Sequence, residues 1–138
     1  IVGAALLNAL EIQGKALNDI KIVCLGAGAA GIASMRLLMA LGVRREQIWM
    51  VDRKGIIHVE RTDLNPYKFA FAQQTQDRTL DQAMRGADVF IGVSGANLIT
   101  AEHLLSMNAN PIVFALSNPD PEIHPQLAKQ VRQDLIMA

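Results

Sequence analysis

Short apolar runs alternate with amphipathic segments along the whole chain. The apolar runs lack the two-residue alternation of a half-exposed strand, which is typical of strands buried on both faces of a sheet. They predict strands at residues 21–25, 47–52, 87–93 and 112–116, with a last strand that begins near residue 135.

Helical periodicity, N-cap residues such as Thr79 and Thr100, and glycine stops mark the segments between these runs. They predict helices at residues 2–13, 29–41, 65–74, 79–86, 100–107 and 120–131, and a small hairpin at residues 56–59. Strands that alternate with helices favour parallel pairing through right-handed crossovers. We therefore predict an α/β fold, a Rossmann-like doubly wound parallel sheet.

The length of 138 residues suits a single domain. We predict one NAD(P)-binding domain over residues 1–138, with residues 1–15 as a leading helix, because no internal repeat or linker is evident. The chain lacks an initiator Met and ends on an apolar run, so both ends are expected to be truncated from a longer polypeptide.

Composition narrows the function classes further. Thirteen basic residues balance thirteen acidic ones, so the chain lacks the positive bias of a nucleic-acid binder. No apolar run approaches the roughly 20 residues of a membrane span. Cys24 is the only cysteine, which excludes an internal disulfide and suits a reducing compartment. We expect a cytoplasmic protein without nucleic-acid or membrane partners.

The clearest candidate site is a glycine-rich turn between the first predicted strand and the next helix. Its G-x-G-x-x-G spacing in this context is typical of dinucleotide binding. The first glycine permits the tight turn, the second lets the backbone approach the pyrophosphate, and the third allows close packing of helix on strand. The helix N-terminus offers free N–H groups to the anion. The predicted contacts are Gly26, Ala27, Gly28, Ala29, Ala30 and Gly31.

Asp52 ends the second predicted strand, 26 residues after Gly26. A carboxylate at this place accepts hydrogen bonds from the ribose of NAD, whereas cations nearby hold the 2′-phosphate of NADP. Arg53 and Lys54 follow at once, so the residues fit either cofactor, and a solvated pair of loop charges is the alternative. We predict binding of NADP or NAD through these three residues and favour NADP slightly.

Two later loops also follow predicted strands. Ser94 and Asn97 come after residues 87–93, and Asn118 comes after residues 112–116. Because the carboxyl ends of parallel strands line the ligand crevice, we predict that all three border the dinucleotide, with Gly92 beside them. A glycine-rich loop without a ligand, or an Asx-turn at the helix entry, is the alternative.

No second pattern of catalytic or metal-ligating residues is evident. The three histidines lie in separate predicted elements without ligand spacing, and surface positions are expected for them. The remaining aspartates fit helix caps and solvated loop charges: Asp63, Asp77, Asp81 and Asp88. We therefore predict neither a metal ligand nor a catalytic group within this chain.

Four stretches together resemble the NAD(P)-binding domain of malic enzyme, particularly the shorter bacterial type. They run in the family's order over nearly the whole chain, at residues 21–31, 51–57, 87–94 and 114–122. The first stretch alone would fit many dehydrogenases. The Asp-x-Lys-Gly-x-Ile stretch together with Ala-Leu-Ser-Asn-Pro is much more specific.

This resemblance implies oxidative decarboxylation of L-malate to pyruvate and CO₂, with hydride transfer to NAD(P)⁺. It also implies a Mg²⁺ or Mn²⁺ ion that polarises the C2 oxygen and stabilises the enolate. Among the residues here, it assigns the glycines of the turn and Asp52 to the dinucleotide and places Asn118 near malate, as a substrate-binding residue. A homo-oligomer is implied for the full-length protein.

The same resemblance places the family's Tyr–Lys acid–base pair and its acidic metal ligands upstream of Ile1. Tyr67 and Lys68 fall in a different element and do not replace the pair. We therefore expect the isolated chain not to turn over malate, and the metal ligands to lie elsewhere in the full enzyme.

Two alternatives stay open from the residues. The chain could be the NAD(P)-binding domain of another dehydrogenase, of the shikimate, glutamate or methylene-tetrahydrofolate type. It could also be a non-catalytic module in which dinucleotide binding shifts a conformational equilibrium. An Asp-rich metal segment just before Ile1 would separate malic enzyme from the first, and binding without turnover in the longer protein would favour the second.

Overall fold

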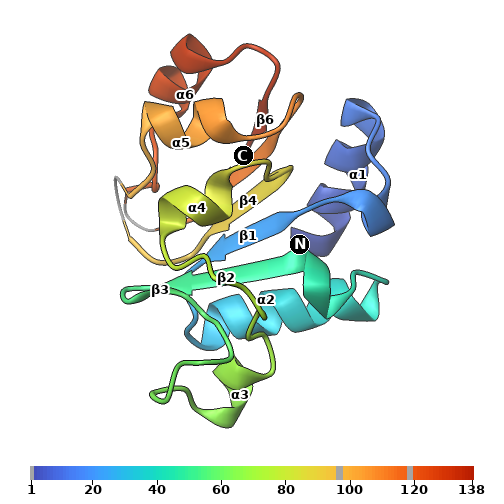
Figure 1. Cartoon of the computed structure of the whole chain (residues 1–138). Coiled ribbons are helices and arrows are strands. Elements are labelled where there is room, and N and C mark those ends of the chain that lie inside the picture. Colours follow the sequence, from blue (N-terminus) through green and yellow to red (C-terminus); the bar gives the residue numbers. More distant parts are fainter. Residues whose placement is uncertain (1, 96–97, 118–119) are drawn as a thin grey trace.

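Six strands form one sheet in the computed structural model, in the order β3-β2-β1-β4-β5-β6 (Figure 1). The structure describes residues 2–95, 98–117 and 120–138. The four strands predicted from 21 to 116 and the last strand are confirmed. The strands are β1 Ile22–Leu25, β2 Ile48–Asp52, β3 Gly55–Ile56, β4 Val89–Gly92, β5 Ile112–Ala115 and β6 Ile136–Met137.

Helices fill the connections, as the capping residues predict. Thr79 accepts a hydrogen bond from the N–H of Gln82, and Thr100 accepts one from the N–H of His103, so both predicted caps are confirmed. The helices are α1 Val2–Gln13, α2 Ala29–Ala40, α3 Pro66–Phe69, α4 Leu80–Met84, α5 Ala101–Ser106 and α6 Pro125–Val131, with 3₁₀ turns at Leu17–Asp19 and Arg45–Gln47.

Every strand pair is parallel except β2 with β3. In that pair Val51 faces Ile56 and Asp52 faces Gly55, so Arg53 and Lys54 form the two-residue turn of a tight hairpin. Gly55 has a φ of 109°, which favours glycine. A hairpin was predicted at residues 56–59. It lies earlier because the chain reverses directly after β2.

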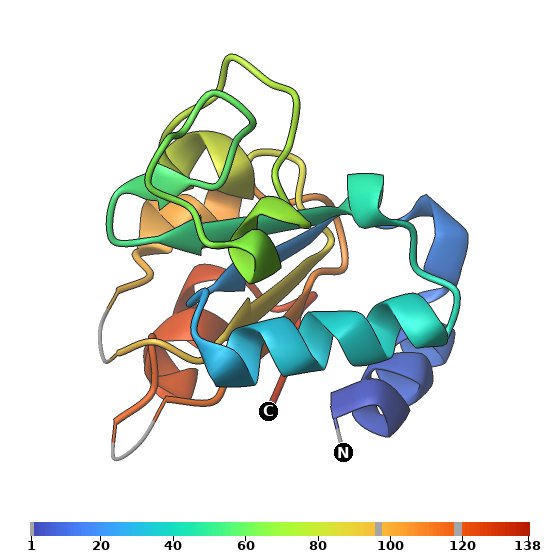
Figure 2. The same ribbon diagram turned by 90° about the horizontal axis from the view of Figure 1, so that it is seen from below.

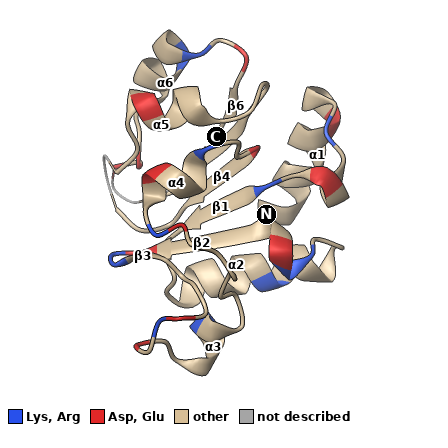
Figure 3. Ribbon diagram, in the orientation of Figure 1, with Lys and Arg blue, Asp and Glu red and all other residues tan. Residues whose placement is uncertain are grey.

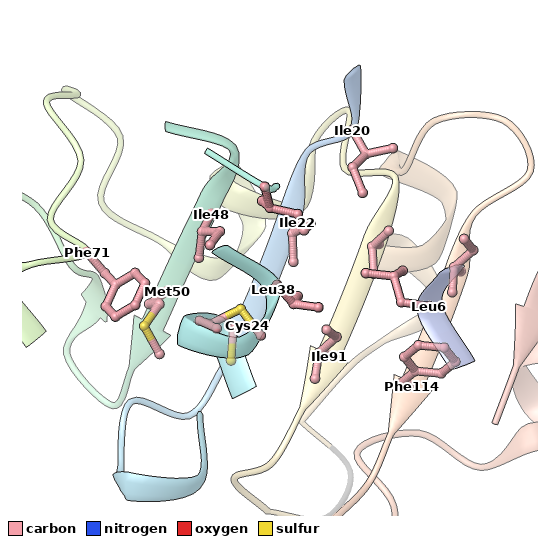
Figure 4. Close-up of a cluster of buried hydrophobic side chains, with 14 of the residues drawn as sticks. Leu6, Ile20, Ile22, Cys24, Leu38, Ile48, Met50, Phe71, Ile91 and Phe114 are labelled. Atoms are coloured by element: carbon pink, nitrogen blue, oxygen red, sulfur yellow. The ribbon is translucent and has the colours of Figure 1, made fainter. Parts of the chain in front are cut away.

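Helices cover both faces of the sheet. Leu6 from α1 and Leu38 from α2 pack on one face with Cys24 and Ile91, in the cluster of Figure 4. α4, α5 and α6 pack on the other face, around Phe90. Figure 2 shows α1 and α2 lying on the same side of the sheet. The doubly wound fold is therefore confirmed, and the order of β1 between β2 and β4 creates a switch point where β1 meets β4.

Two helix boundaries differ from the prediction. α3 ends at Phe69, not near residue 74, because the backbone of Gln73 pairs with the extended segment after β3. The N–H of Gln73 donates to the carbonyl of Ile57, and the N–H of Val59 donates to the carbonyl of Gln73. α6 begins at Pro125, not at Asp120, because Glu122 and Ile123 are buried in the segment that precedes it.

Two polar residues predicted to face solvent are in fact buried. Asp88, just before β4, accepts hydrogen bonds from the ammonium of Lys15 and the N–H of Lys21, at 2.8 and 2.9 Å. The ring of His103 is buried against Asp81. Within the described ranges, no helix is long and apolar enough to cross a membrane.

Candidate dinucleotide-binding site

The glycine turn joins β1 to α2 at the switch point. Gly26 has a φ of 118°, a conformation that side chains rarely adopt. A Cβ on Gly31 would overlap the carbonyl oxygen of Gly26 and lie 3.1 Å from its carbonyl carbon. Nothing lies within 4 Å of a Cβ placed on Gly28. The turn and packing roles of Gly26 and Gly31 are therefore confirmed, and Gly28 faces open space.

The N-terminus of α2 borders the same space. Gly28 is its N-cap residue and brings no side-chain cap. The first N–H groups of a helix have no partner within the helix, so those of α2 remain available for an anion. Ala27 is buried and belongs to the core cluster that also contains Cys24 and Ile91. The turn thus has the geometry of a pyrophosphate cradle.

A hollow of about 570 Å³, which we call the phosphate hollow, opens beside this turn at the carboxyl ends of the strands. It brings together residues from the glycine turn after β1, from the β2–β3 hairpin, from α3 and the segment before it, and from the loop after β4. Its lining is Gly26, Ala27, Gly28, Asp52, Arg53, Lys54, Asp63, Lys68, Val93 and Ser94.

A second hollow of about 500 Å³, the apolar hollow, adjoins it between the hairpin and the start of α4. The two share Asp52, Arg53, Lys54 and Ser94. Apolar walls with a few polar groups at the edge suit a flat, weakly polar ring such as adenine. Its lining is Leu25, Val51, Asp52, Arg53, Lys54, Gly55, Arg78, Thr79, Leu80, Ser94 and Leu98.

Asp52 is the most heavily bonded group in the phosphate hollow. Arg61 donates to both of its carboxylate oxygens, at 2.9 and 2.8 Å. The N–H of Lys54 donates to Oδ1 at 2.9 Å, and the ammonium of Lys68 donates to Oδ2 at 3.2 Å. Arg61 also forms an ion pair with Asp63, and Asp63 forms a second ion pair with Lys54. Figure 3 shows this clustering of charge after β2 and before α3.

The charges in this network shift the titration of both acids. Burial alone would raise the pKa of Asp52, but hydrogen bonds from Arg61, Lys54 and Lys68 outweigh it and hold the pKa below its ordinary value. Hydrogen bonds from Arg61 likewise lower the pKa of Asp63. Both carboxylates are therefore ionised at neutral pH, and the guanidinium between them is held in place.

A third carboxylate, Glu122, lies under the neighbouring loops and has no exposed surface. Its Oε2 accepts a hydrogen bond from the N–H of Ser94, and its Oε1 accepts one from the N–H of Ser117, both at 3.1 Å. A Cβ on Gly92 would come within 2.7 Å of the Glu122 side chain. Gly92, which was expected to border the dinucleotide, is thus buried and makes room for Glu122.

A comparison with known families distinguishes between the functional interpretations of this site. Residues 1–134 match the model described as malic enzyme, NAD binding domain. The chain belongs to this family. The match favours the malic enzyme interpretation over the other dehydrogenases and over a separate sensing module.

Individual relatives agree with the family match. The chain is 58% identical to the NADP-dependent malic enzyme of Halomonas elongata and 44% identical to the NAD-dependent malic enzyme of Rhizobium meliloti. The alignments cover 100% and 99% of this chain, but 33% and 18% of those two proteins. The chain therefore spans a third or less of the length of these relatives.

Solved structures show the same domain. The NAD-dependent malic enzyme of Thermotoga maritima has a TM-score of 0.87 at 39% identity, over 99% of this chain and 37% of its own. The malic enzyme of Entamoeba histolytica has a TM-score of 0.88 at 34% identity, over 95% of this chain and 29% of its own. A glutamate dehydrogenase from Thermus thermophilus, 16% identical with a TM-score of 0.69, shares the fold alone.

The structure gathers most of the predicted cofactor residues into one place. Gly26, Ala27, Gly28 and the three residues Asp52, Arg53 and Lys54 line the phosphate hollow with Ser94. Ala29 and Ala30 form the exposed first turn of α2. Asn97 and Asn118 lie outside the described residues. Contact of any of these with a dinucleotide stays a prediction.

Three residues of the site were missed by sequence reasoning: Arg61, Lys68 and Glu122. Arg61 lies in the irregular segment after β2 and Lys68 in the short helix α3 that follows it, and seven charged residues fall from 52 to 68. That density of opposite charges was a usable signal for an ion-pair network. Glu122 follows a proline in a predicted helix, and nothing in its sequence context indicates burial.

The metal of the family finds no site in the part of the chain that the structure describes. No group of three or more His, Cys, Asp or Glu side chains there could hold an ion. The described residues of this chain therefore do not by themselves fit the divalent metal.

Proposed function

We propose that this chain is the coenzyme-binding part of an NADP-preferring malic enzyme, which as a whole protein oxidises and decarboxylates L-malate to pyruvate and CO₂. The family match supports the reaction class, and the bonding of Asp52 supports the choice of coenzyme. The carboxylate of Asp52 is already saturated by cations and an amide, so cations dominate the end of the site where the adenosine ribose would lie.

The coenzyme fits the two hollows in one orientation. The pyrophosphate would lie on the turn at Gly28, against the free N–H groups of α2, where a side chain would fill the space. Adenine would enter the apolar hollow between Leu25, Val51 and Leu80. When bound, the nicotinamide supplies the hydride acceptor, and this chain's residues bind and orient it.

The case for NADP rests on counting acceptors and charges. An ionised carboxylate offers about four lone-pair sites, and Asp52 already accepts four hydrogen bonds. A ribose hydroxyl would have to displace one of these donors. Four cations surround only two carboxylates here, Asp52 and Asp63. The excess positive charge suits a 2′-phosphate, which cations bind through charge-assisted hydrogen bonds.

The remaining parts of the proposal come from the family. The relative from Halomonas elongata, 58% identical, is described as NADP-dependent. We extend its reaction and its substrate L-malate to the whole protein, with Asn118 as a malate-binding residue. The divalent metal, the homo-oligomer and the cytoplasmic location expected from the sequence also stay proposals.

Titration of the chain with NADP⁺ and NAD⁺ tests the coenzyme proposal. Arg53→Ala, Lys54→Ala and Lys68→Ala each remove one cation from the phosphate hollow. We expect each to weaken NADP⁺ binding by about tenfold, because one charge-assisted contact to the 2′-phosphate is lost, and to leave NAD⁺ binding almost unchanged. Lys129→Ala, at an exposed position on α6, is the matched control and should change neither affinity.

Two results would contradict the proposal. If NADP⁺ binding is indifferent to all three substitutions, these cations do not hold the 2′-phosphate. If the wild-type chain binds NAD⁺ more tightly than NADP⁺, Asp52 does accept the ribose despite its present partners.

A further inference from the structure

The carboxylate of Glu122 connects the ends of two neighbouring strands. It is fully buried, and it accepts hydrogen bonds from the N–H of Ser94, two residues after β4, and of Ser117, two residues after β5. We propose that Glu122 is a positioning residue for the nicotinamide half of the coenzyme: it fixes these two loops relative to each other. This inference rests on the proposed function, since it concerns the same bound dinucleotide.

A buried carboxylate is costly, so its presence calls for a physical reason. Removing a carboxylate from water costs several kcal/mol unless partners replace the lost hydration. Among residues 2–95, 98–117 and 120–138, no cation forms an ion pair with Glu122. Its described partners are backbone N–H groups. An apolar side chain of similar size would pack at lower cost, so the carboxylate is explained by what it holds together.

The surrounding backbone is shaped for this side chain. Gly92 is the last residue of β4, and a Cβ there would lie 2.7 Å from both Cγ and Oε2 of Glu122. Glycine weakens a strand interior, and it is favoured where another group must approach closely. The backbone of Glu122 contributes as well, because its carbonyl accepts a hydrogen bond from the N–H of Ile99 at 3.1 Å. One residue thus holds the loop after β4 at two points.

The location of these loops decides which part of the coenzyme they affect. In a doubly wound fold, each half of the sheet binds one nucleotide, and the switch point lies between them. Asp52 and the apolar hollow occupy the β2 side, where adenosine would bind. β4 and β5 form the other side. Glu122 therefore acts through Ser117 on the nicotinamide half, and through Ser94, which also lines the apolar hollow, at the boundary between the two halves.

The test compares a whole coenzyme with a fragment that lacks nicotinamide. Glu122→Gln keeps the size of the side chain but replaces one acceptor by an NH₂ group, which faces an N–H donor. Glu122→Met removes charge and hydrogen bonds while it keeps an apolar side chain of similar length, so it should fold even if Glu122→Gln does not. Glu102→Gln, exposed on α5, is the matched control.

The measurement is a ratio for each variant: the dissociation constant of NADPH divided by that of adenosine 2′,5′-bisphosphate. NADPH fluorescence gives the first constant, and competition against NADPH gives the second. NADH and ADP form a parallel pair. We expect both Glu122 variants to weaken NADPH binding more than fragment binding, and so to raise the ratio of the NADPH constant to the fragment constant by about fivefold, because the loops lose their shared acceptor. Glu102→Gln should leave the ratio unchanged.

Several outcomes would overturn the proposal. An unchanged ratio in a folded variant would show that Glu122 does not position the nicotinamide half. A parallel loss of both affinities, or the failure of both variants to fold, would assign Glu122 to general stability. If the wild-type chain binds neither coenzyme nor fragment, the proposed function itself fails, and this inference fails with it. Wild-type binding with an unchanged ratio rejects the inference alone.

Discussion

The carboxyl edge of the sheet has an open surface and a packed layer beneath it, and each contains one glycine and one carboxylate of interest. Gly28 and Asp52 line the phosphate hollow, and a Cβ on Gly28 would touch nothing within 4 Å. Gly31 and Glu122 are buried below, in contact with backbone that carries the site. The same residue types therefore have two environments at one edge: the open pair lines the hollow that we propose for the coenzyme, and the packed pair supports the backbone around it.

This difference also separates stability from binding. A substitution in the packed layer must move backbone or a buried charge, so its first effect is on folding. A substitution on the open surface meets empty space or charged side chains that line the hollow, so we expect its first effect on coenzyme binding. Substitutions that change one property without the other are the way to test the division.

Gly31→Ala should have the largest effect on stability. Its Cβ would overlap the carbonyl oxygen of Gly26, and a backbone atom cannot move aside as a flexible side chain can. We expect a loss of about 3 kcal/mol in the free energy of unfolding, even though alanine is the better helix former. Urea unfolding measures it. A loss below about 1 kcal/mol would show that α2 can shift away from β1.

Gly92→Ala should cost somewhat less, because the group it meets is the side chain of Glu122. We expect a loss of about 2 kcal/mol from overpacking. In a Glu122→Ala background the space is vacant, so the same substitution should cost little. Urea unfolding of the two single variants and the double variant gives the coupling between the sites. Additive losses would mean that Gly92 is not there to accommodate Glu122.

The packed layer marks the limit of what the sequence could predict. Local signals sufficed for the strands, for the caps at Thr79 and Thr100, and for the turn of Gly26 and Gly31, because spacing and residue type alone specify them. Glu122 was missed because the burial of a carboxylate depends on tertiary partners, and one of them, the N–H of Ser94, is 28 residues away in the sequence. α3 ends early and α6 begins late for the same reason: tertiary contacts override the local helix signals.

Gly28→Ala should reverse the pattern of Gly31→Ala. Gly28 has a φ of −81°, which alanine readily adopts, and its Cβ would point into open space. The free energy of unfolding should change by less than about 1 kcal/mol, the usual range for an N-cap glycine. NADP⁺ binding should fall by at least about tenfold, equal to about 1.4 kcal/mol, because the methyl group occupies the place of the pyrophosphate. If a folded variant binds NADP⁺ as tightly as wild type, the pyrophosphate does not lie on this turn.

Asp52→Asn should lower stability only modestly, and its difference from wild type should depend on pH. The folded-state pKa of Asp52 is lowered, so its carboxylate stabilises the fold above the unfolded pKa of about 3.9, and this contribution is lost as the pH falls through the folded pKa. We expect the variant to be about 1 kcal/mol less stable than wild type at pH 7, with the difference shrinking between pH 5 and pH 3.

Asp88, whose pKa is also lowered, titrates in both proteins and cancels from the comparison. Urea unfolding at pH 7, 5 and 3 measures the difference, and Asp19→Asn at an exposed position should show no such trend. A difference that stays constant with pH would mean that Asp52 supports the fold independently of its charge, as Gly31 does through packing, and the open surface would then share the structural role of the layer below it.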